Sequence, residues 1–271
     1  MSEQDVSIVV PVFNEERTVA SVARALVKLE PGFELIFVND GSTDNSQEVL
    51  EKFADRIKII SLKRNHGKGF ALAIGVKRAN GKIIVFLDAD LVNLKPEHVE
   101  RMVMPLLINQ AQVVIASISS TSGLFDPLTL FSGQRAYFRK DLFPYLSQMS
   151  KTRYGIEVYL NKTLRKKKTK IIKLKDISYV LKKHKMDSSK LPSIYLKEVL
   201  DITKTIAQIN GMSLKKAKSV YNKEKIKSLK DLLKMIGESE DMMEDLKEVK
   251  RYINSYLAKH FKFKNNNENS Y

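Results

Sequence analysis

Two aspartates one residue apart, Asp88 and Asp90, directly follow the apolar run at residues 83–87. A run of this length and composition predicts a buried strand, so both carboxylates would emerge where the strand meets a loop. Paired carboxylates bind hard cations such as Mg²⁺ and Mn²⁺ and leave coordination positions for phosphate oxygens. Such an ion would neutralise the charge that develops on a departing diphosphate group. Taken alone, the pair is equally compatible with an acidic surface turn.

Three more apolar runs end in polar segments of the same kind. Glu15 follows the first run, Asp40 the second and Lys68 the third. A carboxylate in such a place can accept hydrogen bonds from a ribose or a base, and a lysine can attract a phosphate. Each residue also has a structural explanation, because Asp caps helices, Glu favours a helix N-terminus and glycine-flanked residues form turns. The three runs are residues 6–12, 34–38 and 57–62.

The elements that must position these residues alternate along the first 118 residues. Val19, Val22, Ala23 and Leu26 follow the i, i+3, i+4, i+7 spacing of one helix face. Strands that alternate with helices imply a mostly parallel, Rossmann-like α/β sheet covered on both faces, with its ligand at the carboxyl edge. We therefore expect all four polar segments at one edge. Further helices are expected at residues 49–53, at 68–78 and from Pro96, and further strands at 112–117, 171–174 and 177–181.

The overall composition is that of a soluble globular protein. The chain has 271 residues, of which 43% are hydrophobic and 29% charged, and it contains no cysteine. Disulfides and thiolate metal sites are thereby excluded. Without an apolar run long enough to span a membrane, and without a signal-peptide pattern, the chain is expected to be cytoplasmic.

The net charge of +16 is unevenly distributed. Residues 1–120 sum to −1 and residues 121–271 to +17. Basic surfaces attract phosphates, anionic lipid headgroups or nucleic acid, so a peripheral membrane contact is compatible with this half. Solvated lysine-rich helix faces are the alternative explanation.

Four segments in this order and spacing resemble glycosyltransferase family 2, whose members have the GT-A fold: VSIVVPVFNEERTV, FELIFVNDGSTDNS, GKGFALAIGVKRANG and IIVFLDADL. The resemblance covers roughly residues 6–91. It implies a donor site for a nucleotide-activated sugar. By that resemblance Pro11 and Glu15 would line the donor nucleotide pocket, Asp40 would bind the base, Lys68 would contact the donor, and Asp88 and Asp90 would serve its phosphates, with Asp90 the most direct metal ligand.

The resemblance continues downstream. LFSGQRAYFRKDLF is similar to the acceptor-loop segment of this superfamily, with matches at Ser132, Gly133 and Arg135, and RYGIEVYL is similar to the helix that follows. Arg135 would bind an anionic group of the acceptor bidentately, and Glu157 would contact the acceptor or act as a base. His184 sits where related transferases complete the metal site; an exposed histidine in a basic stretch is the alternative.

Together these segments look most like the soluble branch that includes glucosyl-3-phosphoglycerate synthase, followed by the polyprenyl-phosphate sugar synthases. Val92 stands where the second group has a glutamine, and the segment before the Ser-Gly motif is shorter than theirs. Both features disfavour a lipid acceptor. Leu72 occupies the position of the third glycine of the dinucleotide-binding fingerprint, which disfavours a dinucleotide site.

The expected domain plan has a GT-A domain at residues 1–190, with a donor half at 1–118 and an acceptor half at 119–190. A basic helical region follows at 191–262, and a disordered tail at 263–271. Residues 209–217, continuing to residues 226–233, are similar to a helix-hairpin-helix, which binds nucleic-acid phosphates. Packing against the catalytic domain, or oligomerisation, is the commoner explanation, so nucleic acid is not the expected partner.

The sequence predicts a metal-dependent glycosyltransferase. It would use Mg²⁺ or Mn²⁺ and move a sugar from a UDP- or GDP-linked donor to a small or phosphorylated acceptor. One alternative is a catalytically inactive, transferase-like scaffold whose basic helical tail binds nucleic acid or an anionic surface. The complete set of strand-end acids argues against it. The second alternative is a polyprenyl-phosphate glycosyltransferase.

Overall fold

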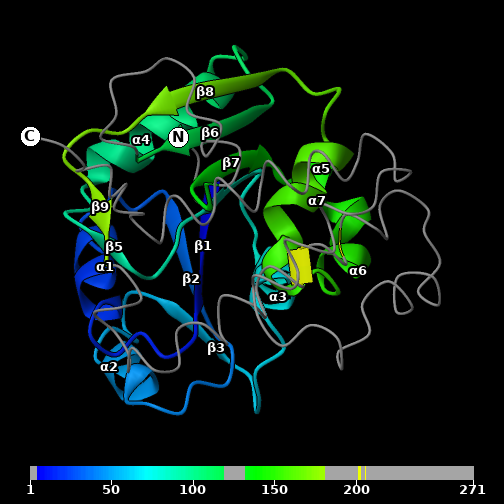
Figure 1. Cartoon of the computed structure of the whole chain (residues 1–271). Helices are drawn as coiled ribbons and strands as arrows, with labels where there is room; N and C mark the ends of the chain where they lie inside the picture. The colour runs from blue at the N-terminus through cyan, green and yellow to red at the C-terminus, as the bar shows by residue number, and fades with distance from the viewer. Residues whose placement is uncertain (1–4, 119–131, 181–200, 203–204, 206–271) are drawn as a thin grey trace, which may run out of the picture.

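A seven-stranded sheet with the strand order β3-β2-β1-β4-β7-β6-β8 forms the centre of the molecule (Figure 1). The computed structural model describes residues 5–118, 132–180, 201, 202 and 205. All neighbouring strands run parallel except β7, which is antiparallel to both β4 and β6. The strands are β1 (Val6–Val12), β2 (Phe33–Asn39), β3 (Lys58–Ser61), β4 (Ile83–Phe86), β6 (Val113–Ser117), β7 (Arg135–Phe138) and β8 (Thr169–Lys173).

Helices cover both faces of this sheet, and each face has its own apolar core (Figure 1). The alternating side chains of β1 divide between the cores, so that Ile8 and Val10 belong to one and Val9 to the other. One face carries α1 (Val19–Leu26), α2 (Ser46–Glu51) and α4 (Pro96–Leu107). The other carries α3 (Lys68–Arg78), α5 (Arg139–Leu142), α6 (Leu146–Met149) and α7 (Ile156–Thr163), with short 3₁₀ turns η2 (Phe143–Tyr145) and η3 (Arg153–Gly155).

The predicted α/β class with a mostly parallel sheet is confirmed. The strand register aligns Val12 with Asn39 and Asn39 with Ser61, so β1, β2 and β3 end at a common edge. Phe86 of β4 aligns with Val9, and the chain then continues to the same edge through Asp88. The four polar segments therefore lie together, as the pattern of the sequence requires.

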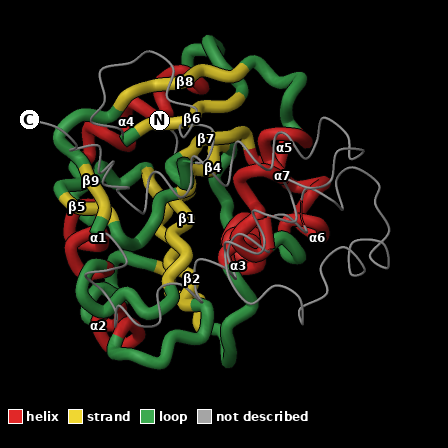
Figure 2. Tube along the Cα trace, in the orientation of Figure 1, coloured by secondary structure: helices red, strands yellow, loops and turns green. Residues whose placement is uncertain are grey.

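Two features of the sheet were not predicted. Strand β7 lies between β4 and β6, where Arg135 pairs with both Phe86 and Ile115. Because β7 is antiparallel, it begins at the edge where its neighbours end. The second feature is a two-stranded ribbon of β5 (Leu91–Val92) and β9 (Ser178–Tyr179), in which β5 packs against α1 (Figure 2).

Most predicted boundaries differ from the observed ones by a few residues. Helix α3 has the predicted bounds, whereas α2 begins at Ser46, earlier than its apolar positions suggest, and ends at Glu51, before Phe53. The strand expected at 177–181 is shortened to the two residues of β9 within the described part. Of the basic helical region expected at residues 191–262, the structure describes Asp201, Ile202 and Thr205, and all three are helical. The helix-hairpin-helix resemblance and the predicted tail lie outside the described residues, and the domain plan stays a prediction. No helix in the described part is both long and apolar enough to cross a membrane.

Candidate active site

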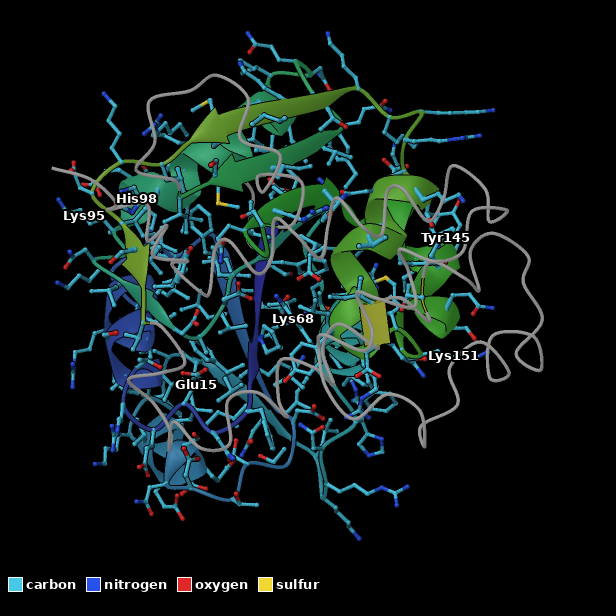
Figure 3. The ribbon with its side chains drawn as sticks, in the orientation of Figure 1. Glu15, Lys68, Lys95, His98, Tyr145 and Lys151 are labelled. Atoms are coloured by element: carbon cyan, nitrogen blue, oxygen red, sulfur yellow. The ribbon has the colours of Figure 1, made fainter. Side chains whose placement is uncertain are left out.

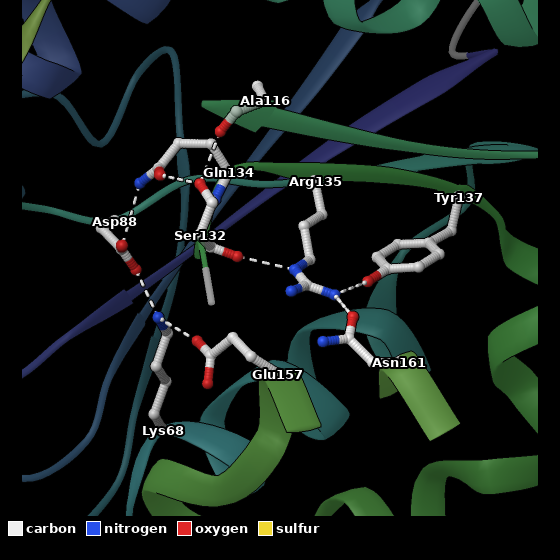
Figure 4. A network of polar contacts seen from close by, with 9 residues as sticks. All are labelled: Lys68, Asp88, Ala116, Ser132, Gln134, Arg135, Tyr137, Glu157 and Asn161. Carbon is white, nitrogen blue, oxygen red and sulfur yellow. Dashed lines mark hydrogen bonds and ion pairs between the residues drawn. The ribbon is translucent and has the colours of Figure 1, made fainter. Parts of the chain in front are cut away.

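Three charged side chains from distant parts of the chain meet at the carboxyl edge of the sheet (Figure 4). Lys68 is the first residue of α3, Asp88 follows β4, and Glu157 lies in the first turn of α7. The Lys68 Nζ atom lies 2.6 Å from Asp88 Oδ1 and 2.7 Å from Glu157 Oε1. The ammonium group therefore joins a carboxylate of the predicted donor side to one of the predicted acceptor side.

Lys68 is held in its charged form by these neighbours. Burial acts to lower the pKa of its ammonium group, because the charge loses hydration. The attraction and hydrogen bonds of Asp88 and Glu157 act in the other direction and prevail, so the pKa of Lys68 is raised above its ordinary value. In the view of Figure 3 Lys68 lies between β1 and the helices α3 and α7, near the middle of the molecule. A permanent positive charge in this place can attract a phosphate group.

The second oxygen of Asp88 is held by Gln134, at the start of β7. The Gln134 Nε2 atom donates to Asp88 Oδ2 at 2.9 Å, and Ser132 Oγ lies 2.7 Å from Gln134 Oε1 (Figure 4). Ser132 Oγ also lies 2.5 Å from the carbonyl oxygen of Ala116, so its single proton has two acceptors. Because a carboxylate only accepts, the amide of Gln134 must present its nitrogen to Asp88. This chain of bonds fixes the Asp88 carboxylate from the side of β7.

Gly133 lies directly over the ion pair. A Cβ atom at this position would collide with both carboxylate oxygens of Asp88 and would lie 2.7 Å from Lys68 Nζ. Any larger residue would therefore push the turn away from the site. This steric limit gives a physical reason for glycine in the Ser-Gly motif.

Arg135 is enclosed by protein atoms and only 2% exposed. Its Nε donates to the Ser132 carbonyl oxygen at 2.6 Å, and its Nη1 donates to Asn161 Oδ1 at 2.7 Å and to Tyr137 Oη at 3.3 Å (Figure 4). Burial raises the pKa of the Tyr137 hydroxyl, and the guanidinium opposes that rise. These contacts tie the Ser132 turn to β7 and α7. They favour a positioning role for Arg135 over the predicted binding of an acceptor anion.

Asp40 organises the loop that precedes α3. Its Oδ1 accepts from the His66 amide at 2.8 Å and its Oδ2 from the Gly67 amide at 2.7 Å. Burial raises the pKa of the Asp40 carboxyl, and these two hydrogen bonds oppose the rise. Asp40 thus lies at the predicted edge, with both oxygens bonded to the backbone beside Lys68. Its predicted contact with a base stays a prediction.

The loop after β1 is tied to the loop after β2. The Glu15 amide donates to Ser46 Oγ at 2.8 Å, and the Glu16 amide donates to Asp44 Oδ2 at 3.1 Å. The Glu15 side chain accepts from Thr18 Oγ1 at 2.6 Å, as expected of an acid near the start of α1. Figure 3 shows Glu15 in the region below Lys68. Pro11 lies in β1, paired with Val38 of β2, one residue before the strand ends.

A divalent cation is compatible with the oxygen ligands at this edge. Among the described residues no three histidine or acidic side chains form a ready metal site, so Asp88 and Asp90 would need phosphate oxygens or water as further ligands. Both oxygens of Asp88 are engaged by the neighbours described above. The role of Asp90 as the most direct metal ligand stays a prediction. His184 lies outside the described residues. Val180, which precedes His184 in the chain, lies beside Asp90: its amide donates to the Asp90 carbonyl oxygen at 3.0 Å.

Two residues of the site were missed in the sequence. Gln134 had no signal of its own, because an uncharged amide next to an arginine fits many surface turns. Arg153, in η3, donates to the His66 carbonyl oxygen at 3.1 Å and to Asn65 Oδ1 at 3.0 Å. Both lie inside segments that carried the resemblance, LFSGQRAYFRKDLF and RYGIEVYL, at positions to which the resemblance assigned no role.

Comparison with known proteins gives a family match over most of the described chain. Residues 7–171 match the family model described as glycosyl transferase family 2. Undecaprenyl-phosphate 4-deoxy-4-formamido-L-arabinose transferase of Proteus mirabilis (strain HI4320) is 41% identical over 106 residues, which are 36% of this chain and 32% of that protein. The protein of the same name from Pseudomonas syringae pv. syringae (strain B728a) is 35% identical over 123 residues, 42% of this chain and 36% of that protein. The chain thus spans about a third of the length of these relatives.

Solved structures match over a larger share of the chain. Glucosyl-3-phosphoglycerate synthase from Mycobacterium tuberculosis, in complex with Mn²⁺, UDP and glucosyl-3-phosphoglycerate, has a TM-score of 0.57 at 23% identity and covers 74% of this chain and 80% of its own. S. aureus TarS 1–349 has a TM-score of 0.55 at 16% identity and covers 93% and 83%, respectively. At these identities the likeness concerns the fold, and it confirms the predicted GT-A arrangement.

Proposed function

The chain belongs to glycosyl transferase family 2, and we propose on this premise that it moves a sugar from a nucleoside-diphosphate sugar to a phosphate-bearing acceptor. The observation that carries the proposal is the meeting of Asp88, Lys68 and Glu157 at the carboxyl edge of the sheet. Two carboxylates and one partly buried cation suit a site that binds a charged substrate and releases a charged product. Gly133 lets the backbone of its turn lie close to them.

The donor side of the proposed site lies over β1, β2 and β4. Glu15, Asp40 and Pro11 would surround the base and ribose of the donor, because their segments are bonded to one another at that edge. Lys68 would bind the diphosphate. Because two carboxylates already share its charge, the metal ion proposed below would be needed to offset the negative charge that a diphosphate adds.

The proposed site includes a Mg²⁺ or Mn²⁺ ion. Asp90 would hold it most directly, with Asp88 and His184 as further ligands. When bound, such an ion neutralises negative charge on a leaving diphosphate. The contribution of the chain itself is to keep the two acids of this segment in fixed positions, through Lys68 and Gln134 for Asp88 and through the β9 segment for the backbone of Asp90.

The acceptor would approach between α7 and the turn at Ser132. Glu157 is positioned there by its 2.7 Å contact with Lys68, and we assign it the contact with the acceptor nucleophile, from which it would take a proton. Arg135 would act through the Ser132 turn, in keeping with its burial.

A phosphorylated acceptor is the chemistry shared by the similar proteins. The curated relatives are named for undecaprenyl phosphate, and the mycobacterial synthase was crystallised with phosphoglyceric acid. A small phosphate ester and a polyprenyl phosphate are therefore the two acceptors to compare. Transfer to one and not to the other, from the same donor, would separate them.

A thermal-shift panel of nucleoside diphosphates tests the proposal. We expect UDP or GDP to raise the melting temperature of the protein, and to raise it more when Mn²⁺ is present. Asp90→Ala should lose the Mn²⁺-dependent part of the shift and all transfer, while its unfolding without ligand stays close to that of the wild type. Asp55→Ala, which removes an exposed acid far from the site, is the matched control. A full Mn²⁺-dependent response in Asp90→Ala would refute the proposed site.

The charge of +17 on residues 121–271 favours one rival function, a scaffold that binds an anionic surface. Such a protein would be retained on DNA or on anionic lipid in a salt-sensitive way and would show no shift with any nucleoside diphosphate. A nucleotide response would rule out the scaffold as the whole function.

A further inference from the structure

The loop of residues 65–67 is held from two opposite sides. On one side the carboxylate of Asp40 accepts the amide protons of His66 and Gly67. On the other side Arg153 donates Nη1 to the His66 carbonyl oxygen at 3.1 Å and Nη2 to Asn65 Oδ1 at 3.0 Å. The carboxylate of Asp40 thus accepts hydrogen bonds from the amides of this loop, and the guanidinium of Arg153 donates hydrogen bonds to its oxygen atoms.

Arg153 also packs directly on the backbone of this loop. Gly67 has a φ of 100°, and a Cβ atom there would lie 2.9 Å from Arg153 Cγ. Arg153 itself has a φ of 48°, in the left-handed region that residues other than glycine rarely adopt. A conformation of this kind persists only where surrounding contacts fix it. The contacts of Arg153 therefore determine its backbone as well as its side chain.

The anchor of Arg153 comes from beyond the matched family region, which ends at residue 171. Asp201 Oδ2 lies 3.4 Å from Arg153 Nε, and Asp201 is 8% exposed. Its neighbour Ile202 is 2% exposed, which shows that this short stretch is packed against the rest of the protein.

A second contact fixes the same stretch. Thr205 Oγ1 lies 3.4 Å from the Thr152 carbonyl oxygen and 2.9 Å from that of Asp201. A Cβ atom on Gly155 would lie 2.5 Å from Thr205 Cβ, so the glycine permits the close approach. The residues on both sides of Arg153 therefore touch the stretch that carries Asp201.

The loop held by Arg153 leads directly into the site. Gly67 precedes Lys68, and the Gly67 carbonyl oxygen accepts the first hydrogen bonds of α3, from Phe70 and Ala71. A shift of this loop would move the start of α3 and with it the ammonium group that contacts Asp88 and Glu157.

We propose that Arg153 is a positioning residue for the donor side of the site, and that Asp201 anchors it. Asp201, together with Thr205, thereby sets the position of loop 65–67 and of Lys68. The part of this inference that concerns the donor rests on the proposed function, while the anchoring itself does not.

Hydrogen exchange on the full chain tests the anchoring without any ligand. Asp201→Asn keeps the shape of the side chain and removes its charge, and Arg153→Met removes the guanidinium while keeping much of the apolar stem. We expect the amides of His66 and Gly67 to exchange roughly tenfold faster in both variants, since a hydrogen bond to a charged group is lost or loosened. Arg101→Met is the control, because its guanidinium donates in the same way, to the Lys173 carbonyl oxygen at 3.0 Å, far from this loop. Should Arg153→Met fail to fold, Asp201→Asn alone decides the result.

Titration with UDP and GDP in the presence of Mn²⁺ tests the role in donor binding. For the nucleotide that binds the wild type, we expect an affinity about tenfold weaker in Asp201→Asn and Arg153→Met, and unchanged in Arg101→Met. In turnover, KM for the donor should rise more than kcat falls. Unchanged exchange at His66 and Gly67, or faster exchange with unchanged nucleotide affinity, would overturn the inference. A wild-type protein that binds neither nucleotide would instead contradict the proposed function, and the exchange result would still decide whether Asp201 anchors Arg153.

Discussion

One ammonium group facing two carboxylates is the main electrostatic feature of the site at the scale of single residues. Lys68 contacts Asp88 at 2.6 Å and Glu157 at 2.7 Å, and the side chains of all three are less than a third exposed, at 19%, 29% and 13%. Removing one partner of a largely buried ion pair costs much more than the pair contributes, because the remaining charge is left without compensation.

Lys68→Met should therefore lower the free energy of unfolding by about 3 kcal/mol. The double variant Lys68→Met/Glu157→Gln should recover part of this loss, since it leaves one uncompensated carboxylate fewer. Denaturant unfolding of the two variants measures both effects. Lys82→Met is the control, because Lys82 contacts Asp5 at 3.0 Å with a side chain that is 80% exposed. If Lys68→Met were as stable as the wild type, the three charges would not be coupled as described.

Gln134 offers a prediction that concerns binding rather than stability. Gln134→Leu removes the donor to Asp88 Oδ2 and leaves a side chain of similar size, so Asp88 would lose this contact with the segment before β7 and keep its ion pair with Lys68. We expect the Mn²⁺-dependent affinity for a nucleoside diphosphate to fall about tenfold, a loss within the range of a hydrogen bond to a charged group. Isothermal titration measures this. Gln112→Leu, which removes an acceptor of the Lys168 amide at 3.1 Å, should bind like the wild type. Equal affinities for the two variants would remove Gln134 from the site.

The residues of the site could be identified from the sequence more readily than the contacts between them. Asp88 and Lys68 stand at strand ends and could be identified from the alternation of apolar runs and polar turns. Their link to Glu157 could not be predicted, because it joins residues 89 positions apart, brought together where η3, the turn before α7, packs on α3. The burial of Arg135 was also beyond prediction, because an arginine beside a glycine turn more often faces solvent.

At the scale of elements, the start of α4 carries a buried titratable group. His98 is 7% exposed, and its Nδ1 accepts from the Lys95 amide at 3.2 Å, which satisfies one amide at the N-terminus of the helix (Figure 3). Burial lowers the pKa of His98, and a hydrogen bond with the Lys175 backbone partly opposes this. The neutral imidazole is therefore the form that suits the folded protein.

The stability of the protein should depend on pH through this residue. The unfolded chain binds a proton at the ordinary histidine pKa of about 6.5, whereas the folded chain binds it only at lower pH. The contribution of neutral His98 to the free energy of unfolding is thus fully present above the pKa of the unfolded chain and is lost as the pH falls below it. His98→Gln keeps an acceptor for the Lys95 amide and does not titrate. Its free energy of unfolding should fall less than that of the wild type between about pH 7.5 and about pH 5.5. Parallel curves for the two proteins would contradict the assignment.

Helices and strands that are bounded by clear turn residues in the sequence could be predicted, and elements of only two to four residues could not. Helix α3 is bounded by Gly67 and by the Asn80-Gly81 turn, and its predicted and observed limits agree. Strand β7 has four residues and begins with an arginine, so it lacks the apolar run that signals a buried strand. The two-residue strands β5 and β9 depend entirely on each other for their pairing.

At the scale of the whole molecule, the alternation of strands and helices was sufficient to predict the α/β class and the edge that carries the site. The insertion of β7 between β4 and β6 was not predictable, because nothing local in the sequence specifies which strands become neighbours. The same limit applies to the contact between Arg153 and Asp201, which joins two residues far apart in the sequence.

The antiparallel direction of β7 has a consequence for how such a protein could diversify. Ser117 at the end of β6 and Ser132 before β7 are neighbours, since Ser132 Oγ lies 2.5 Å from the oxygen of Ala116. The residues at the two ends of the intervening stretch thus lie close together, and lengthening a connection between two fixed points costs little, about 0.6 kcal/mol per doubling. Grafting a longer stretch between these two serines should leave nucleotide affinity and unfolding nearly unchanged while altering which acceptors are used. Natural insertions between Ser117 and Ser132 could change the acceptor specificity in the same way and leave the rest of the sheet unchanged.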